Sequence, residues 1–153
     1  MVRGFLLNNQ LTDFSFVAEQ DGKTVANKVE PGKRPRSTMA PTMVFDREGK
    51  LVLLLGSAGG SAIINHLVKT LVAALDRNLN IQEAIDLPNF GSRNGPTELE
   101  RDTGAASWAE ALGALGHEVR MLEMTSGVHG IQRTRYGWSG GADPRREGVA
   151  RGD

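Results

Sequence analysis

The sequence predicts an α+β fold in which mainly antiparallel strands form a sheet and helices pack on it. The apolar run at residues 51–55 shows no alternation with polar residues, which is typical of a strand buried on both faces. Residues 63–75 carry apolar side chains at intervals of three and four, which predicts a helix packed on that strand. Residues 43–45 are also apolar, and a short polar loop containing Gly49 joins them to residues 51–55. The two apolar runs therefore predict a hairpin that is covered on both faces.

Composition excludes several classes of partner. A chain of 153 residues is long enough for one domain with a hydrophobic core. Its formal net charge of +0 gives no indication of a nucleic-acid partner. Because the chain has no cysteine, disulfides and thiolate metal sites are excluded. No apolar run approaches the ~18 residues of a membrane span, so no membrane partner is expected.

The helix predicted at residues 63–75 should bury one apolar stripe and expose its other side. His66 falls outside this stripe and is expected on the polar side. The three histidines of the chain show no metal-ligand spacing, so we expect no metal site, and no cofactor is expected either. The expected apolar stripe comprises Ile63, Ile64, Leu67, Val68, Leu71, Val72 and Leu75.

Local turn and capping signals predict the remaining elements. Residues 4–7 resemble a short strand, and residues 19–35 are expected to form a mobile surface loop without a fold of its own. Gly130 is expected to break the strand in which it lies. The other predicted elements are a helix at 81–86 capped by Asn80 and stopped by Pro88, a strand at 98–100, a helix at 108–115 between Ser107 and Gly116, strands at 117–122 and 127–135, and a turn-rich segment at 136–145.

Two polar clusters are candidates for ligand binding. Residues 8–13 gather amides and a carboxylate, a composition that favours turns because the side chains bond the local backbone. The alternative is a ligand pocket in which Asp13 neutralises an ammonium group and Gln10 adds a hydrogen bond. Further along, Ser37 and Thr38 either cap a turn or bind a carboxylate through their hydroxyls.

The glycine-rich segment at residues 56–61 joins the predicted strand to the predicted helix. It could be a tight junction in which glycine only relieves crowding. It could instead be a phosphate cradle, although the spacings of a Walker loop and of a dinucleotide site are both missing. The third reading is an oxyanion hole in which the amides of Gly59 and Gly60 hold the charge of a tetrahedral intermediate. That reading requires a nucleophile from elsewhere.

Three motifs, taken together and in order, resemble the small subunit of gamma-glutamyltranspeptidases. They are NNQLTDFS at residues 8–15, KRPRSTMAPT at residues 33–42 and GSAGGS at residues 56–61. The closing GADPR at residues 141–145 is similar to the end of that family as well. The resemblance implies a partial αββα sandwich of the N-terminal-nucleophile hydrolase type. It also implies attack on gamma-glutamyl amides such as glutathione, with transfer of the acyl group to an acceptor amino acid, a peptide or water.

The resemblance assigns roles by position. Asp13 would bind the substrate's alpha-ammonium with the help of Gln10. Ser37 and Thr38 would bind its alpha-carboxylate, and Gly59 and Gly60 would form the oxyanion hole. A related acylase that takes glutaryl groups has no substrate ammonium to neutralise. A carboxylate at position 13 therefore favours the glutamyl substrate.

The family's threonine nucleophile has no counterpart in this sequence. We therefore expect residues 1–145 to be the C-terminal portion of a small subunit, followed by a loose polar tail at residues 146–153. The implied partners are the large subunit and the N-terminal part of the small subunit, and the isolated chain is expected to be inactive. The alternative is a non-catalytic remnant or an amino-acid-binding module. Localisation is unknown from the residues, although family members are often periplasmic or secreted.

Overall fold

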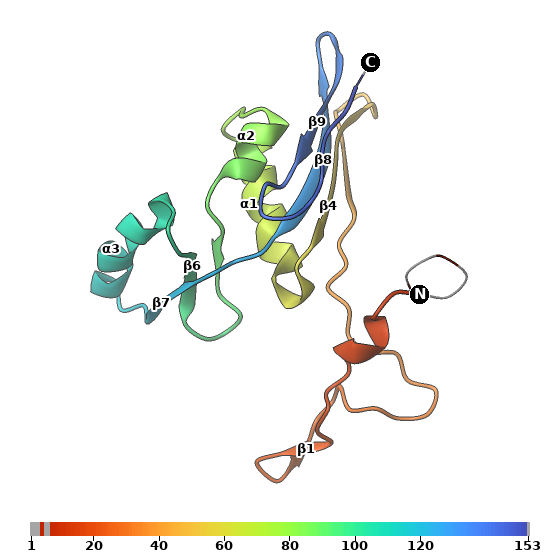
Figure 1. Cartoon of the computed structure of the whole chain (residues 1–153), viewed down its shortest axis with the longest axis vertical. Coiled ribbons are helices and arrows are strands. Elements are labelled where there is room, and N and C mark those ends of the chain that lie inside the picture. Colours follow the sequence, from red (N-terminus) through yellow and green to blue (C-terminus); the bar gives the residue numbers. More distant parts are fainter. Residues whose placement is uncertain (1–3, 5–6, 153) are drawn as a thin grey trace. The chain divides into compact units, whose positions relative to one another are not determined.

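A computed structural model describes residues 4 and 7–152 of the chain (Figure 1). The chain divides into two compact units, Met1–Ser37 and Thr38–Asp153, and each is described by itself. The strand expected at residues 4–7 depends on Phe5 and Leu6, which lie outside the described residues.

The first unit contains a short 3-10 helix and a small hairpin. Gln10–Asp13 form the 3-10 helix η1, and strands β1 (Glu19–Gln20) and β2 (Lys23–Thr24) pair in an antiparallel arrangement. The prediction of a loop without a fold of its own was therefore wrong. The reason lies in the turn, where Asp21 and Gly22 both adopt positive φ values, of 52° and 69°. This is the geometry that lets a two-residue turn close a hairpin.

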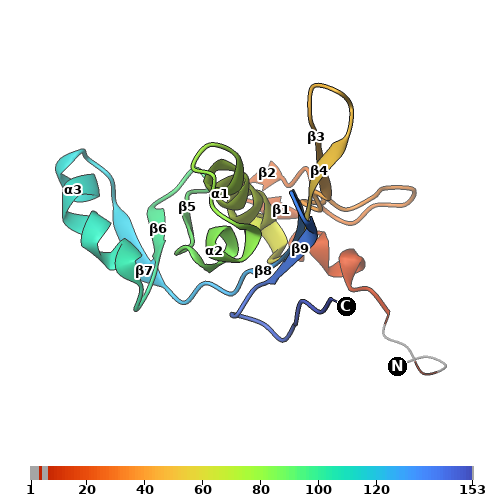
Figure 2. The same cartoon turned by 90° about the horizontal axis from the view of Figure 1, so that it is seen from above.

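The second unit is built around a four-stranded antiparallel sheet with the strand order β3-β4-β8-β9. The helices α1 (Ile63–Leu75) and α2 (Ile81–Asp86) pack on one face of this sheet, as both views show (Figures 1 and 2). The buried core between sheet and helices includes Leu53, Leu55, Leu67, Ile81, Ile85 and Val128. The strands are β3 (Thr42–Phe45), β4 (Leu51–Ala58), β8 (Gly127–Thr134) and β9 (Gly137–Ala142). The predicted α+β class, with antiparallel strands and helices packed on the sheet, is confirmed.

A smaller three-stranded sheet lies on the other side of α1 and α2 (Figure 2). It contains β5 (Phe90–Gly91), β6 (Thr97–Glu100) and β7 (Val119–Leu122), in which β6 and β7 are parallel. The 3-10 helix η3 (Gly104–Trp108) and helix α3 (Ala109–Ala114) connect β6 to β7. The expected N-cap at Ser107 was wrong, because Ser107 lies inside η3 and the N-cap of α3 is Trp108, which makes no side-chain capping bond. The side-chain cap lies at the start of η3, where the Thr103 hydroxyl accepts the amide of Ala105.

Local signals placed other elements correctly. Asn80 caps α2 through a reciprocal pair of bonds: its side chain accepts the amide of Glu83 at 2.9 Å, and the Glu83 carboxylate accepts the amide of Asn80 at 3.1 Å. Gly116 follows α3 with a φ of 91°, as expected of a residue after a helix.

No helix within the described residues is both long and apolar enough to pass through a bilayer. The described part of the chain also holds no cluster of three metal-ligating side chains.

The strand break expected at Gly130 and the turns expected at residues 136–145 were both wrong, because glycines in these strands lie close against α2. Strand β8 runs through Gly130 without a break, and the segment expected to be turn-rich contains β9. A Cβ at Gly130 would lie 2.6 Å from the Ile81 side chain, and one at Gly141 would lie 2.9 Å from the Ile85 side chain. Both glycines are therefore required by the close approach of α2 rather than by a turn.

The predicted burial of the hairpin and of α1 was also wrong in part. Met43 is 65% exposed and Phe45 is 55% exposed, so the hairpin is covered on one face only. On α1, Ile63 and Leu67 are buried, whereas His66, expected on the polar side, is only 2% exposed. Four members of the predicted stripe are exposed instead, namely Ile64, Val68, Val72 and Leu75.

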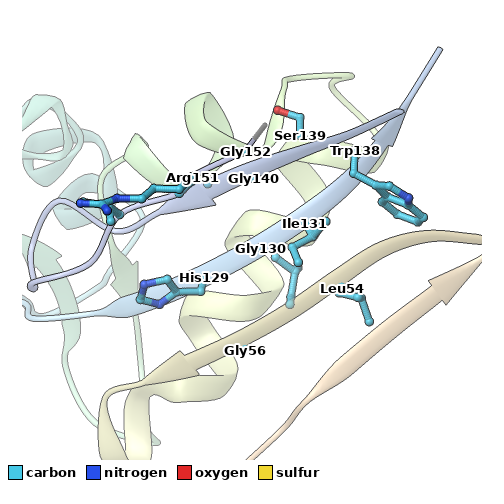
Figure 3. A pocket seen from close by; sticks show the side chains of 14 residues that line it. Leu54, Gly56, His129, Gly130, Ile131, Trp138, Ser139, Gly140, Arg151 and Gly152 are labelled. Carbon is cyan, nitrogen blue, oxygen red and sulfur yellow. The ribbon is translucent and has the colours of Figure 1, made fainter. Parts of the chain in front are cut away.

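The face of the large sheet that α1 and α2 do not cover carries a hollow, which the C-terminal segment covers in part (Figure 3). Leu54 on β4 lies opposite Ile131 on β8, and Trp138 on β9 lines the same hollow. Residues 149–152 also line it, and Arg146 donates to the carbonyl of Ser126 at 3.1 Å. The boundary expected between residues 145 and 146 remains a prediction.

Because this face exposes apolar side chains, we expect the isolated chain to self-associate. Ile131→Thr keeps a β-branched side chain in the strand and should reduce self-association. Leu115→Thr, at the exposed end of α3, is the matched control and should not change it. Size-exclusion chromatography with light scattering over a concentration series measures the effect. A monomeric wild-type chain at high concentration would contradict the prediction.

Candidate functional site

In the first unit, the structure brings together two of the predicted substrate-binding residues. The Gln10 side-chain amide donates to the Ser37 hydroxyl at 2.9 Å, across 27 positions in the sequence. Helix η1 begins at Gln10 and ends at Asp13, so both side chains project from one short turn. The Asp13 side chain is exposed to solvent, as a carboxylate that receives a ligand's ammonium group must be.

Asn27, which no sequence motif singled out, connects Asp13 to Arg36, the residue before Ser37. Its side-chain amide donates to the Asp13 carbonyl at 2.6 Å, and its side-chain oxygen accepts the Arg36 amide at 2.9 Å. The Asn27 carbonyl also accepts the amide of Ser15 at 2.9 Å. A single asparagine in a polar loop carries no local signal of such long-range contacts.

In the second unit, Thr38 contacts the glycine turn directly. Its hydroxyl donates to the carbonyl of Gly60 at 2.5 Å. A hydroxyl has one proton to donate, so in this arrangement the proton of Thr38 is directed at the turn. The structure therefore joins Thr38 to Gly60, while its expected contact with a carboxylate remains a prediction.

The glycine turn is shorter than the sequence suggested, because β4 continues through Ala58. Gly59 has a φ of 135° and Gly60 a φ of 53°, and both values favour glycine. Among the hydrogen bonds of the described residues, neither the Gly59 amide nor the Gly60 amide has an acceptor. The 3-10 helix η2 (Gly60–Ala62) and then α1 follow at once. Two open amide donors thus lie at the positive end of a helix, an arrangement that suits an oxyanion.

His66 lies beneath this turn, on the first full turn of α1. A Cβ at Gly59 would lie 2.9 Å from both Cε1 and Nδ1 of the imidazole. Within the described part of the chain, neither ring nitrogen has a hydrogen-bond partner. Burial, and then the charge of Lys69, lower the pKa of His66, while the neighbouring Ala58 carbonyl opposes that shift. The imidazole is therefore neutral at neutral pH.

Arg93 is a second residue near the turn that no sequence motif singled out. Its guanidinium donates to the Ser61 hydroxyl at 2.6 Å and pairs with Glu98 at 2.9 Å. Ser61 follows Gly60 directly, so a cation lies close to the two open amides. Its position in a loop of glycine and asparagine gave no indication of this contact.

Lys69 on α1 and Arg145 in the C-terminal segment bind the same two backbone carbonyls, at the end of α2. The Lys69 ammonium donates to the carbonyls of Ile85 at 2.9 Å and Leu87 at 2.7 Å. Arg145 donates to the same carbonyls at 3.3 and 3.1 Å. Burial, with the charge of Arg145 adding to it, lowers the pKa of Lys69 to about 8.

Two buried carboxylates compensate these cations. Glu100 binds Arg145 through both of its oxygens and also accepts the Asn89 amide at 2.7 Å. Asp143 accepts from the Ser126 hydroxyl at 2.5 Å and from the Val128 amide at 3.0 Å. Burial alone would raise the pKa of Asp143, but these hydrogen bonds lower it. The closing GADPR motif thus fixes the C-terminal segment to the second unit.

Comparisons with known proteins agree with the motifs. The family model described as Gamma-glutamyltranspeptidase matches residues 1–152. The glutathione hydrolase proenzyme of Escherichia coli (strain K12) is 37% identical over 151 residues, which cover 93% of this chain and 26% of the relative. The chain spans about a quarter of the length of the curated relatives that it matches.

Solved structures show the same relationship. A mutant of Helicobacter pylori gamma-glutamyltranspeptidase aligns with a TM-score of 0.79 and 32% identity, over 95% of this chain and 83% of that chain. A cephalosporin acylase from Bacillus halodurans aligns with a TM-score of 0.71 and 25% identity, over 90% of this chain and 25% of that chain. The chain therefore belongs to the gamma-glutamyltranspeptidase family and has the N-terminal-nucleophile hydrolase fold of that family.

Proposed function

We propose that this chain supplies the substrate-binding and oxyanion-stabilising part of a gamma-glutamyl transferase or hydrolase that acts on glutathione-type amides. The observation that carries the proposal is the pair of open amides at Gly59 and Gly60. Thr38 holds the carbonyl of Gly60 from one side, and α1 begins on the other. Donors fixed in advance cost no reorganisation when charge develops on the reacting carbonyl oxygen.

The first unit would bind the amino-acid end of the substrate. Asp13 neutralises the alpha-ammonium and Gln10 adds a hydrogen bond, while Ser37 receives the alpha-carboxylate. Thr38, the first residue of the second unit, would join Ser37 once its hydroxyl turns from the Gly60 carbonyl to the ligand. The bond from Gln10 to Ser37 supports this assignment, because it joins an ammonium-binding residue to a carboxylate-binding residue. The alpha-ammonium and the alpha-carboxylate of a glutamyl group are bonded to the same carbon. The protein groups that bind these two charges must therefore lie side by side.

The nucleophile would come from the rest of the enzyme. A threonine hydroxyl attacks the gamma-glutamyl amide, the carbon–nitrogen bond breaks, and the amine leaves with a proton. Water or the amine of an acceptor amino acid or peptide then attacks the resulting ester. The chain matches only 26% of the Escherichia coli relative, which supports a partnership with a large subunit and with the N-terminal part of the small subunit.

A related acylase is the second candidate, since the cephalosporin acylase shares the fold. The two candidates differ in their need for Asp13. A gamma-glutamyl group has an alpha-ammonium, and a glutaryl group lacks it but is otherwise the same. A non-catalytic remnant is the third candidate, and it predicts no turnover in any assembly.

A chimera tests the proposal by carrying this chain in place of the matching part of the Escherichia coli enzyme. We expect it to hydrolyse gamma-glutamyl-p-nitroanilide in preference to glutaryl-p-nitroanilide, while the isolated 153-residue chain hydrolyses neither. Asp13→Ala removes one charge-assisted contact and should lower kcat/KM for the glutamyl substrate on the order of 10- to 100-fold. The glutaryl substrate should be hardly affected.

Glu19→Ala is the matched control, because Glu19 is an exposed acid of the same unit. It should leave both substrates unchanged. Equal losses on both substrates in Asp13→Ala would remove the ammonium-binding role. A preference for the glutaryl substrate would favour the acylase, and an inactive chimera that has assembled correctly would favour the remnant.

A further inference from the structure

We propose that His66 is a positioning residue, which holds the Ala58–Gly59 peptide so that the Gly59 amide is directed toward the reacting oxygen. The inference rests on the proposed oxyanion role of Gly59 and deepens it. It assigns the geometry of the turn to a side chain of α1 that itself makes no contact with the substrate.

The first support is the contact between the imidazole and the turn. An added Cβ at Gly59 would be 2.9 Å from Nδ1 and Cε1 of His66, so the ring packs directly against the Gly59 backbone. Gly60, by comparison, has no atom within 4 Å of an added Cβ. The ring therefore supports one of the two amide-bearing residues and leaves the other open.

The second support is the planarity of the peptide bond. The Ala58 carbonyl favours protonation of the imidazole and so acts to raise the pKa of His66, although neither ring nitrogen makes a hydrogen bond in the described part of the chain. In a planar trans peptide, the carbonyl of Ala58 and the amide of Gly59 point in opposite directions. A ring on the carbonyl side therefore leaves the Gly59 amide on the opposite side, where it meets no acceptor among the described residues.

The third support is the cost of placing a histidine here. His66 is 2% exposed, and both of its nitrogens are without hydrogen-bond partners in the described part of the chain. A buried polar group of this kind destabilises a fold, so an apolar residue would serve packing better. The loss of stability caused by these unpaired nitrogens is consistent with a functional requirement for a ring that can interact with the Ala58 carbonyl.

The charged groups around His66 set its protonation. Lys69, on the same helix, and Arg145, in the C-terminal segment, both disfavour the imidazolium, whereas Asp143 favours it. Because the pKa of His66 is lower in the folded chain than in the unfolded chain, protonation of His66 destabilises the fold as the pH falls below 6.5. The Ala58 carbonyl, which already accepts from the Ser57 hydroxyl at 2.6 Å, is the group toward which a protonated ring would donate.

Nuclear magnetic resonance of the full chain tests the coupling without any catalysis. In glycine-labelled protein, the Gly59 amide should shift with the same pH midpoint as the His66 ring. His66→Leu should abolish that titration, and His117→Leu, remote from the turn, should preserve it. A Gly59 amide that is insensitive to pH while His66 titrates would overturn the proposal.

Kinetics of the chimera give a second test, which separates positioning from packing. His66→Leu should lower kcat about tenfold with KM little changed, because only the transition state uses the amide. Its stability toward urea should equal or exceed that of the wild type, since an unpaired polar group is removed. His66→Asn, whose side-chain amide can donate to the Ala58 carbonyl, should recover most of kcat.

The outcomes distinguish this inference from the proposed function. If the chemical shift of the Gly59 amide titrates with the His66 ring but His66→Leu retains full kcat, the coupling exists and the oxyanion role is wrong. If Gly59 is insensitive to His66 while the chimera still depends on Gly59, the oxyanion role stands and the positioning role is wrong. A loss of kcat that parallels a loss of stability in both His66 variants would reduce His66 to a packing residue.

Discussion

Gly59→Ala should destabilise the chain strongly and remove most activity from an assembled enzyme. Its φ of 135° is a conformation that alanine rarely adopts, and the new methyl group would lie 2.9 Å from His66. Backbone strain and overpacking each cost about 1–3 kcal/mol. Loss or displacement of one oxyanion donor lowers kcat by about 10²–10³-fold. Urea denaturation followed by tryptophan fluorescence, together with anilide hydrolysis by the chimera, measures both effects.

Gly60→Ala is the matched control for the stability effect. Its φ of 53° lies in the left-handed region, and an added methyl group would meet no atom within 4 Å. Its cost should be limited to about 1–2 kcal/mol of backbone strain. Combining Gly59→Ala with His66→Ala should recover part of the lost stability, because the steric clash is removed. Equal destabilisation by both glycine variants would contradict the contact between Gly59 and His66.

Arg145→Met should destabilise the chain by about 3–5 kcal/mol, since it leaves buried carboxylates without their cation. Arg145 binds Glu100 through two hydrogen bonds and Asp143 through one at 3.2 Å. It also binds the carbonyls of Ile85 and Leu87, which lose a donor in the variant. Thermal unfolding and urea denaturation of the purified chain measure the change.

Arg120→Met provides the comparison on the surface. Arg120 also binds a glutamate, Glu118, through two of its nitrogens, but both side chains are exposed. An exposed ion pair contributes about 0–1 kcal/mol, so this variant should remain close to the wild type. If the two variants behaved alike, the cluster around Arg145 would be more hydrated than its burial indicates.

The sequence predicted elements whose signals are local. The hairpin of β3 and β4, the start of α1 and the Asn80 cap of α2 each depend on residues close together in the chain. The packing of α1 could not be predicted in this way. Lys69 is buried because its ammonium binds carbonyls 16 and 18 residues away, and no local pattern reports such partners. Four apolar residues of the same helix are exposed instead.

The candidate site shows the same division. The motifs selected Gln10 and Ser37, which the structure joins, and Thr38 and Gly60, which it also joins. His66 escaped selection because helical periodicity placed it on the polar side. His66 is buried beneath a turn whose Gly60 carbonyl accepts from Thr38, 22 residues earlier in the chain, and helical periodicity does not report such a contact. Asn27 and Arg93 also act through distant partners.

The glycines under α2 bear on how this chain could be redesigned. At Gly130 and Gly141, the space of a methyl group is already filled by side chains of the helix. Enlarging either residue would displace α2, and with it the carbonyls that hold Lys69. Mutagenic libraries should keep both glycines and place their diversity at positions such as Gly95 and Gly113, where an added Cβ meets nothing.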